Sequence, residues 1–168
     1  MRKLCLLFLL IGTYCYAGER KYTVDSPDGK IQLAIIQTDA GELTYQLSVK
    51  RKQVIDASAL GFKTEDGLTF PFRGWKMGKV TRNKVNSVWK PLWGKRAVVP
   101  DKYNEMKLSF VNEAKSSDAL EVVARAYNEG VAFRYVSPQG ADSALELTTF
   151  NFAGDYTAWC YNGGRHNI

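Results

Sequence analysis

Cysteine and histidine are scarce in this chain of 168 residues, which contains three cysteines and one histidine. Two of the cysteines, Cys5 and Cys15, lie in an N-terminal segment that we expect to be removed. Cys160 would then remain alone, so an intramolecular disulfide is excluded even in an oxidising compartment. Because His166 is the one histidine, a conventional zinc site within this chain is excluded as well.

The first 17 residues have the three-part layout of a secretory signal peptide. Arg2 and Lys3 give a positive start, residues 4–11 form an unbroken apolar run, and Ala17 provides a small residue for cleavage. The apolar run is shorter than the about 20 residues that a bilayer-spanning helix needs. We therefore predict cleavage before Gly18 and a soluble periplasmic or secreted product without a membrane span.

A lipoprotein signal ending at Cys15 is the alternative, but bulky Tyr14 precedes this cysteine where such signals prefer a small residue.

Removal of residues 1–17 leaves 151 residues, which is enough for one domain with a core of its own. The net charge falls from +6 to +4, because the removed segment holds two basic residues and no acidic one. This excess is mild, and the run Lys50-Arg51-Lys52 is predicted to be a solvated turn, so no nucleic-acid footprint is present.

Alternating apolar and polar residues predict β-strands nearly throughout residues 18–168. The alternation is clearest over 31–36, 43–50, 106–110, 120–126, 131–135 and 145–147. Turn-forming triplets separate several of these runs, namely Asp39-Ala40-Gly41, Asn128-Glu129-Gly130 and Pro138-Gln139-Gly140. Short strands of period two joined by such turns predict an all-β fold, an antiparallel sandwich. No stretch of helical length has a 3.6-residue period, and residues 112–119 are expected to form a loop.

Sequence signatures of catalysis are missing: the chain has no Gly-x-Ser-x-Gly elbow, phosphate loop or dinucleotide fingerprint. Glu105 and Glu129 are the candidate acid/base pair. Glycoside cleavage needs two carboxylates facing one bond, about 5–5.5 Å or 6.5–9.5 Å apart, and sequence spacing does not supply that distance. Each glutamate adjoins an asparagine near a strand or turn, which favours a hydrogen-bonding or surface position.

Two further features were considered as binding sites. The segment from Asp25 to Lys30 holds two carboxylates beside a glycine, but it lacks the alternating acids of an EF-hand loop, so a turn is predicted. The four tryptophans offer flat faces for stacking on sugar rings. Packing in a β-core is the favoured reading for each of them, since tryptophan is highly buried on average. They are Trp75, Trp89, Trp93 and Trp159.

Taken in order, several short segments resemble the N-terminal domain of glycoside hydrolase family 97. They are Ser26-Pro27-Asp28-Gly29-Lys30, Ser58-Ala59-Leu60-Gly61, Pro91-Leu92-Trp93-Gly94-Lys95, Tyr103-Asn104-Glu105-Met106, the stretch from Arg125 to Tyr135, and Phe150 to Trp159. The stretch RAYNEGVAFRY, residues 125–135, is the most specific of these. The resemblance runs over nearly all of residues 18–168.

The resemblance implies a galactose-mutarotase-like super-sandwich joined to a (β/α)8 catalytic barrel and a small C-terminal β-domain. It implies activity on α-linked oligosaccharides, as α-glucosidase or α-galactosidase, and a calcium ion near the active site. The family's catalytic residues lie on the barrel, and a calcium-binding glutamate follows its tryptophan strand. No glutamate follows Glu146 here, so no catalytic or metal residue is assigned to this chain. Because the family's super-sandwich is longer than 151 residues, we expect a truncated domain and no glycosidase activity of the chain alone.

Two functions remain open on the sequence. The first is the N-terminal, substrate-pocket-supporting module of a glycosidase whose barrel is missing from this chain. In that case Trp159, Arg165 and His166 are the candidate carbohydrate-binding residues at the pocket edge, while a frayed terminus is the competing interpretation. The second is a free-standing carbohydrate-binding or adhesion sandwich without enzymatic activity.

Overall fold

Eleven strands and no helix make up the part of the chain that the structure, a computed structural model, describes: residues 19–65, 67, 69–71, 75–112, 119–137 and 144–157. The strands are β1 (Arg20–Asp25), β2 (Ile31–Gln37), β3 (Leu43–Val49), β4 (Lys52–Ala59), β5 (Phe62–Thr64), β6 (Thr69–Phe70), β7 (Trp75–Trp89), β8 (Val99–Asn112), β9 (Ala119–Ala126), β10 (Val131–Val136) and β11 (Ala144–Glu146). Over these ranges, nothing helical is present that would be long and apolar enough to cross a membrane.

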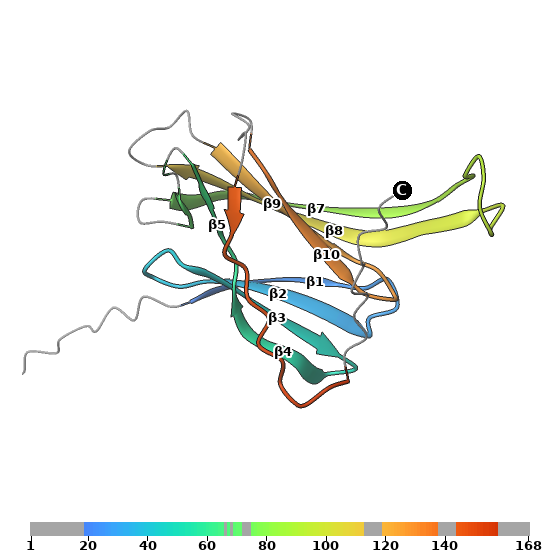
Figure 1. Cartoon of the computed structure of the whole chain (residues 1–168), viewed down its shortest axis with the longest axis horizontal. Helices are drawn as coiled ribbons and strands as arrows, with labels where there is room; N and C mark the ends of the chain where they lie inside the picture. The colour runs from blue at the N-terminus through green and yellow to red at the C-terminus, as the bar shows by residue number, and fades with distance from the viewer. Residues whose placement is uncertain are drawn as a thin grey trace, which may run out of the picture.

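The strands form two four-stranded sheets and one smaller sheet, and each named pair is antiparallel. The orders are β1-β2-β3-β4, β10-β9-β8-β7 and β11-β5-β6. The two larger sheets face each other, and the strands of the third lie across one side of them (Figure 1). The predicted all-β antiparallel sandwich is therefore confirmed.

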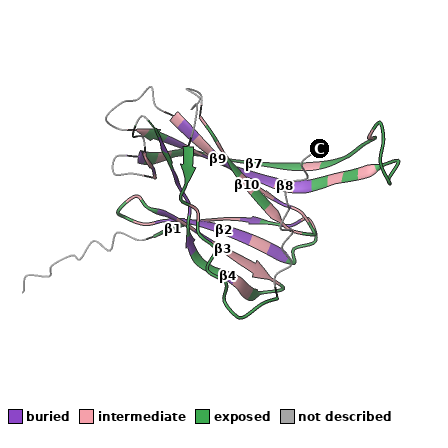
Figure 2. Cartoon of the chain, in the orientation of Figure 1, coloured by how far each residue is buried: buried purple, intermediate pink, exposed green. Residues whose placement is uncertain are grey.

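The core lies between the two larger sheets, where every second residue of a strand points inward. Leu33 and Ile35 of β2 enter it from one sheet, and Met106, Leu108 and Phe110 of β8 enter it from the other. Buried residues accordingly lie on strands of both larger sheets, whereas the end of the hairpin of β7 and β8 is exposed or intermediate (Figure 2). The alternation seen in the sequence thus identified the two inner faces.

Aromatic rings join the third sheet to this core. Phe70 of β6 is fully buried and makes edge contacts with Trp75 and Phe110, at centroid distances of 5.5 and 5.2 Å. Phe62 of β5 lies 5.8 Å from Phe70 and 5.0 Å from Tyr135 of β10. These contacts are worth about 0.5–1.5 kcal/mol each beyond the area that they bury.

The predicted turns are formed where the structure describes them. Gly41 has a φ of 85° in the connection between β2 and β3, a conformation that glycine adopts without steric cost. Lys50 and Arg51 both have positive φ, 50° and 67°, as a two-residue hairpin turn requires, and both are exposed. The triplet at 128–130 connects β9 to β10, whereas residues 138–140 lie outside the described residues.

Sequence alternation missed some strands and shortened others. It predicted none of β1, β4, β5, β6 and β7, and it found only the second half of β8. Most of β7 is exposed, and the buried positions in the missed part of β8 include the polar residue Glu105 besides Tyr103, so no continuous apolar face imposes a period of two there. Of the predicted loop at 112–119, the first residue ends β8, the last begins β9, and residues 113–118 lie outside the described residues.

The chain after β11 runs back along β4 and pairs with its free edge. Backbone hydrogen bonds link Leu147 to Gly61, Thr149 to Ala59, Asn151 to Asp56 and Ala153 to Val54, at 2.8–3.0 Å. We call residues 147–153 the C-terminal strap. It covers an edge that would otherwise present unpaired backbone groups.

Candidate functional site

Four polar and aromatic side chains form a cluster on the outer face of the sheet that contains β8 and β9. Tyr103 and Glu105 occupy odd positions of β8, opposite in direction to the core residues at 106, 108 and 110. Arg125 occupies the matching position of β9, directly beside Glu105 in the strand register, and Tyr127 follows two residues later. Strand pairing therefore unites residues that are about twenty positions apart in the sequence.

An ion pair holds this cluster together. The Nε atom of Arg125 donates to Oε2 of Glu105 at 2.8 Å, and the Arg125 guanidinium lies 4.3 Å from the centroid of the Tyr103 ring. The Tyr103 and Tyr127 rings are 5.0 Å apart. The hydrogen bond to Glu105 raises the pKa of Arg125, and burial raises the pKa of Tyr103. Glu105 is itself buried, so its charge is compensated by a charge-assisted hydrogen bond.

This geometry gives Glu105 a structural function. Its carboxylate accepts a hydrogen bond from the Arg125 guanidinium, and this bond ties β8 to β9. Glu129 is exposed in the turn between β9 and β10 and is not a member of the cluster. The structure thus confirms the hydrogen-bonding position predicted for Glu105 and the surface position predicted for Glu129.

A shallow depression lies beside the cluster. Its volume is about 140 Å³, and its lining consists of Val123, Arg125, Tyr127, Ala132, Phe133 and Arg134. Sites for drug-sized ligands are about 300–1,000 Å³, so this depression is too small to enclose an oligosaccharide. It offers at most a partial contact surface.

The segment from Asp25 to Lys30 is the turn that the sequence predicted. Asp28 accepts hydrogen bonds from the Ser26 hydroxyl at 2.6 Å and the Lys30 backbone at 3.1 Å, and its carboxylate pairs with the Lys30 ammonium at 3.0 Å. The Ser26 hydrogen bond, followed by those from Lys30, lowers the pKa of Asp28 to about 2. The carboxylate is thus saturated by partners within its own turn.

The same turn attaches one sheet to the other. The backbone N–H of Asp28 donates to Oδ1 of Asn128 at 3.1 Å, and Nδ2 of Asn104 donates to the carbonyl of Asp25 at 2.7 Å. Asn104 and Asn128 belong to two of the segments that resemble the family, and the segment with Asn128 is the most specific of them. Their side chains therefore connect the sheets, which explains the asparagines next to Glu105 and Glu129 without invoking catalysis.

The tryptophans divide into two environments. Trp75 is 5% exposed and packs on Phe70, as predicted. Trp89 and Trp93 are 55% and 88% exposed, so the packing predicted for them is wrong. Both lie at the end of the β7–β8 hairpin, beyond the last residue of β9 that could cover β8. Trp159 lies outside the described residues.

The candidate carbohydrate-binding residues lie outside the described residues; they are Trp159, Arg165 and His166. The predicted signal peptide, residues 1–17, also lies outside them. Within the described residues, no three His, Cys, Asp or Glu side chains gather at a point that could hold a metal ion. The described cluster that sequence reasoning missed is Tyr103, Glu105, Arg125 and Tyr127. Its signal was the spacing of two in Tyr103-x-Glu105 and Arg125-x-Tyr127, which places each pair on one strand face.

The chain is similar to the N-terminal region of a glycosidase family and to part of two known glycosidases. Residues 24–167 match the family described as glycosyl-hydrolase 97 N-terminal. A probable retaining α-galactosidase from Streptomyces bingchenggensis is 30% identical over 155 residues, which are 90% of this chain and 24% of the relative. A retaining α-galactosidase from Bacteroides thetaiotaomicron is 26% identical over 162 residues, 94% of this chain and 23% of the relative.

Solved structures agree with this match. A family 97 glycoside hydrolase variant from Pseudoalteromonas sp. strain K8, in complex with panose, has a TM-score of 0.68 and 34% identity over 79% of this chain and 20% of its own. A β-arabinopyranosidase has a TM-score of 0.66 and 27% identity over 78% of this chain and 21% of its own. The chain therefore spans between a fifth and a quarter of these four proteins.

Proposed function

Because the chain belongs to the glycosyl-hydrolase 97 N-terminal family, we propose that it acts as the N-terminal β-sandwich of a bacterial glycoside hydrolase that cleaves α-linked glucosides or galactosides. The family match over residues 24–167 carries this proposal. Two relatives are named as retaining α-galactosidases, and related enzymes bind panose and acarbose. The free-standing adhesion module is not favoured, because the relatives and structures named here are glycosidases.

In this function the sandwich supports the substrate pocket and leaves the chemistry to another part of the enzyme. Glycoside hydrolysis needs two carboxylates across one bond, while Glu105 is paired with Arg125 and Glu129 is exposed in a turn. We assign Trp159, Arg165 and His166 to the pocket edge, where the ring would stack on a sugar and the other two side chains would donate to hydroxyl groups.

A calcium ion near the active site is implied by the family resemblance alone. The described residues bring no metal-binding group together, so they do not fit a calcium site and we assign no ligand among them. We propose that calcium is held by the remainder of the enzyme. Titration of the isolated chain with calcium, followed by calorimetry, is then expected to show no saturable heat.

We also propose that the chain is exported. A signal peptide over residues 1–17 would deliver the chain to the periplasm or the medium, where α-linked oligosaccharides are encountered. The mature sandwich would begin at Gly18 and contain the family match from residue 24 onward.

Hydrolysis of nitrophenyl α-glucoside and α-galactoside tests the proposal. The chain alone, with or without calcium, is expected to show no turnover above a blank. When the polypeptide encoded immediately downstream is fused to it, turnover is expected, because that polypeptide would supply the barrel. An unrelated downstream protein, or turnover by the chain alone that disappears on Glu105→Gln or Glu129→Gln, would overturn the proposal.

The fused enzyme also tests the pocket residues. Arg165→Ala and His166→Ala are expected to raise KM several-fold, because each removes a hydrogen bond to substrate. Lys52→Ala, at an exposed position of β4, is the matched control and should leave KM unchanged. Equal KM values for all three variants would remove the two residues from the pocket.

A further inference from the structure

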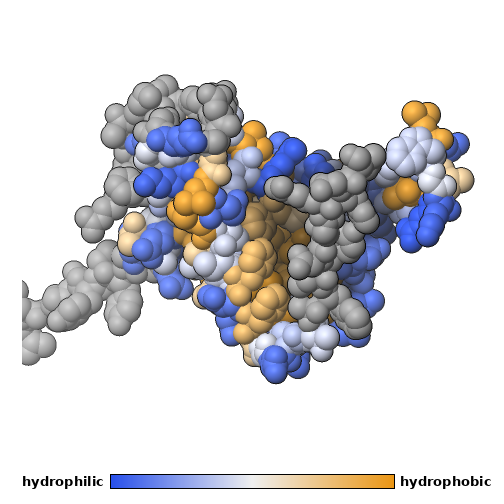
Figure 3. Space-filling view, in the orientation of Figure 1, coloured by the Kyte–Doolittle hydropathy of each residue, from blue (hydrophilic) through white to orange (hydrophobic). Residues whose placement is uncertain are grey.

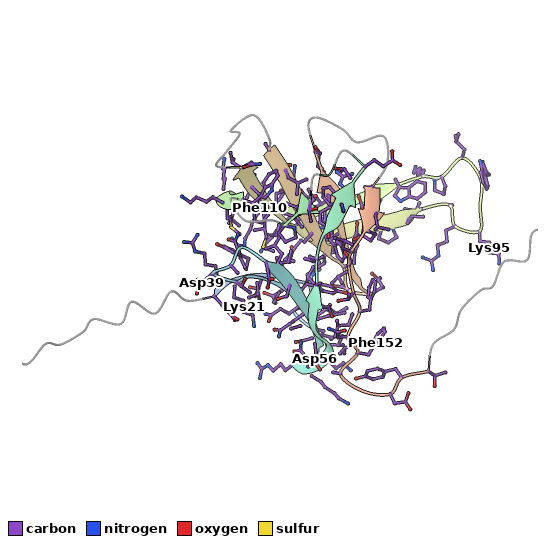
Figure 4. All side chains as sticks on the ribbon, turned by 60° about the vertical axis from the view of Figure 1, so that its left-hand side comes forward. Lys21, Asp39, Asp56, Lys95, Phe110 and Phe152 are labelled. Atoms are coloured by element: carbon purple, nitrogen blue, oxygen red, sulfur yellow. The ribbon has the colours of Figure 1, made fainter. Side chains whose placement is uncertain are left out.

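The hairpin formed by β7 and β8 extends beyond the sheet that supports its base. Strand β9 pairs with β8 only as far as Asn104, opposite Ala126, whereas β7 and β8 remain paired from Val85 and Tyr103 to Trp89 and Val99. Residues 85–103, which we call the hairpin arm, are therefore a ribbon of two strands. The arm projects past the body of the molecule (Figure 1), and Lys95 at its end lies far from Phe110 in the core (Figure 4).

The end of the arm carries large apolar side chains that nothing in the described structure covers. Leu92 is 99% exposed and Trp93 is 88% exposed, and Val88, Trp89 and Val98 are 62%, 55% and 45% exposed. In the space-filling view, hydrophobic residues lie beside hydrophilic ones at this end (Figure 3). Contiguous exposed apolar residues mark interaction sites, and a two-stranded ribbon is at best marginally stable without packing.

Positive charge is concentrated on the same hairpin. Residues 75–112 hold nine basic and two acidic residues, a net charge of +7, while the whole chain has +6. All other residues together therefore carry −1. Lys90, Lys95 and Arg96 lie at the end of the arm beside the two exposed tryptophans. A surface that received this end would need to be acidic around an apolar pocket.

Protection of a sheet edge explains part of this charge. Strand β7 is the last strand of its sheet, and lysines on an edge strand prevent pairing with other chains. That explanation covers Lys79 and Lys84 of β7. It does not cover Leu92 and Trp93, because exposed apolar residues at an edge promote association.

We infer that the hairpin arm is the element through which this sandwich docks onto the rest of the glycosidase, by inserting Trp93 and Leu92 into an apolar pocket surrounded by acidic residues. The inference rests on the proposed function. The relatives indicate the docking partner. The region that this chain matches is 23–24% of their polypeptides, so most of the enzyme remains to cover the exposed arm. Trp93 acts as the anchor, because buried aromatic residues dominate binding energy at interfaces.

Binding measured with a defined probe tests the inference. The probe is the part of the Streptomyces bingchenggensis enzyme that follows its region of similarity to this chain, titrated into the full chain and followed by tryptophan fluorescence and calorimetry. The wild-type chain is expected to bind and to shift its emission to shorter wavelength. Leu92→Ser combined with Trp93→Ser is expected to weaken binding at least tenfold.

A second pair of variants tests the charge. Lys95→Glu combined with Arg96→Glu is expected to weaken binding about tenfold at low salt and to reduce its salt dependence. The matched controls are Leu145→Ser, at an apolar residue that is 64% exposed on β11, and Lys52→Glu combined with Lys63→Glu, at exposed basic positions. The controls are expected to bind like the wild type. All variants change exposed residues, and their thermal unfolding midpoints should match.

Each other outcome overturns the inference in a recognisable way. Binding that is indifferent to the arm variants would mean that another surface docks, and the proposed function would stand. Absence of binding by the wild-type chain would overturn the inference, whereas the proposed function is decided separately by turnover of the fused enzyme. A self-association that disappears in the arm variants would assign the surface to a second copy. Adsorption of the arm to phosphatidylglycerol and phosphatidylethanolamine vesicles, lost in the variants, would assign it to a membrane.

Discussion

At the scale of single residues, charged groups in this sandwich are satisfied by close neighbours. Asp28 accepts from Ser26 and Lys30 within one turn, and Glu105 accepts from Arg125 across two paired strands. Both acids stand in segments that attract attention in the sequence, yet both maintain the fold. Their partners show how: Asp28 fixes its own turn, and Glu105 ties β8 to β9.

The pH dependence of stability tests the contacts of Asp28. Folding lowers the pKa of Asp28 from 3.8 to about 2, so the ionised carboxylate stabilises the folded chain above pH 3.8, and this contribution disappears as the pH falls toward 2. Asp28→Asn is therefore expected to lower the thermal midpoint above pH 4 and to match the wild type near pH 2. Ser26→Ala should shrink the same difference. Parallel midpoint curves for the wild type and Asp28→Asn would contradict the assignment.

Close packing at Gly61 leads to a second prediction. A Cβ at this position would lie 2.5 Å from the Phe70 carbonyl oxygen and 3.0 Å from Cδ of Pro71, which the fixed backbone cannot accommodate. Gly61→Ala is expected to lower the free energy of unfolding by about 1–3 kcal/mol in urea titrations. Gly130→Ala is the control, because nothing lies within 4 Å of its Cβ, and it should stay within about 1 kcal/mol. Equal stability of the two variants would refute this packing argument.

At the scale of elements, the C-terminal strap shows how a segment without a regular strand can complete a sheet. It pairs with β4 through backbone hydrogen bonds and through side chains: Asn151 N–H donates to the buried Ser58 hydroxyl at 2.9 Å, and Thr149 Oγ1 accepts from Ala59 N–H at 2.8 Å. Tyr45 adds a bond from its hydroxyl to the Thr149 carbonyl at 2.8 Å. The strap thus attaches residues about ninety positions apart.

Ser58 is the residue on which this attachment is best tested. Ser58→Ala leaves the N–H of Asn151 without its acceptor, so the free energy of unfolding is expected to fall by about 1–3 kcal/mol. Hydrogen exchange of the Asn151 and Ala153 amides should accelerate more than exchange in β8. Ser87→Ala, at an exposed position, should change stability by less than about 0.5 kcal/mol. Unchanged exchange in the strap would show that the side-chain bond is dispensable.

Alternation in the sequence identified some strands and not others, and burial explains the difference. Alternation found β2, β3, β9 and β10, because each has at least one face against the core. It did not find the arm of β7 and β8, where only Val85 of β7 is half-buried and the more buried side of β8 carries Val99, Asp101 and Tyr103. A period of two in hydrophobicity needs apolar residues at successive positions of one face, and this ribbon does not have them.

At the scale of the whole molecule, charge and apolar surface are unevenly distributed. The hairpin of β7 and β8 carries a net charge of +7 and the most exposed apolar residues, while the other residues together carry −1. This asymmetry is consistent with the docking that we infer for the hairpin arm. The share of the relatives that the chain matches, about a quarter, agrees with such a role.

Export is a prediction about the whole polypeptide. Expression with the native N-terminus is expected to yield a processed protein that begins at Gly18, because Ala17 follows the apolar run of a signal peptide. Intact-mass measurement and N-terminal sequencing of periplasmic and secreted material check this expectation. A folded protein in the cytoplasm that retains Met1 would contradict it, and a lipid-modified Cys15 would support the alternative signal.

The sequence by itself determined the class of fold and the turns around Gly29, Gly41 and Asn128, and the resemblance of its ordered short segments indicated the family. The fold class and the turns depend on local features, namely alternation along a strand and the backbone freedom of turn residues, which a sequence displays directly. Only the tertiary structure decided that Glu105 pairs with Arg125 and that Trp93 is exposed. Both outcomes depend on strand register and on where a neighbouring strand ends, which are set by contacts between residues distant in the sequence.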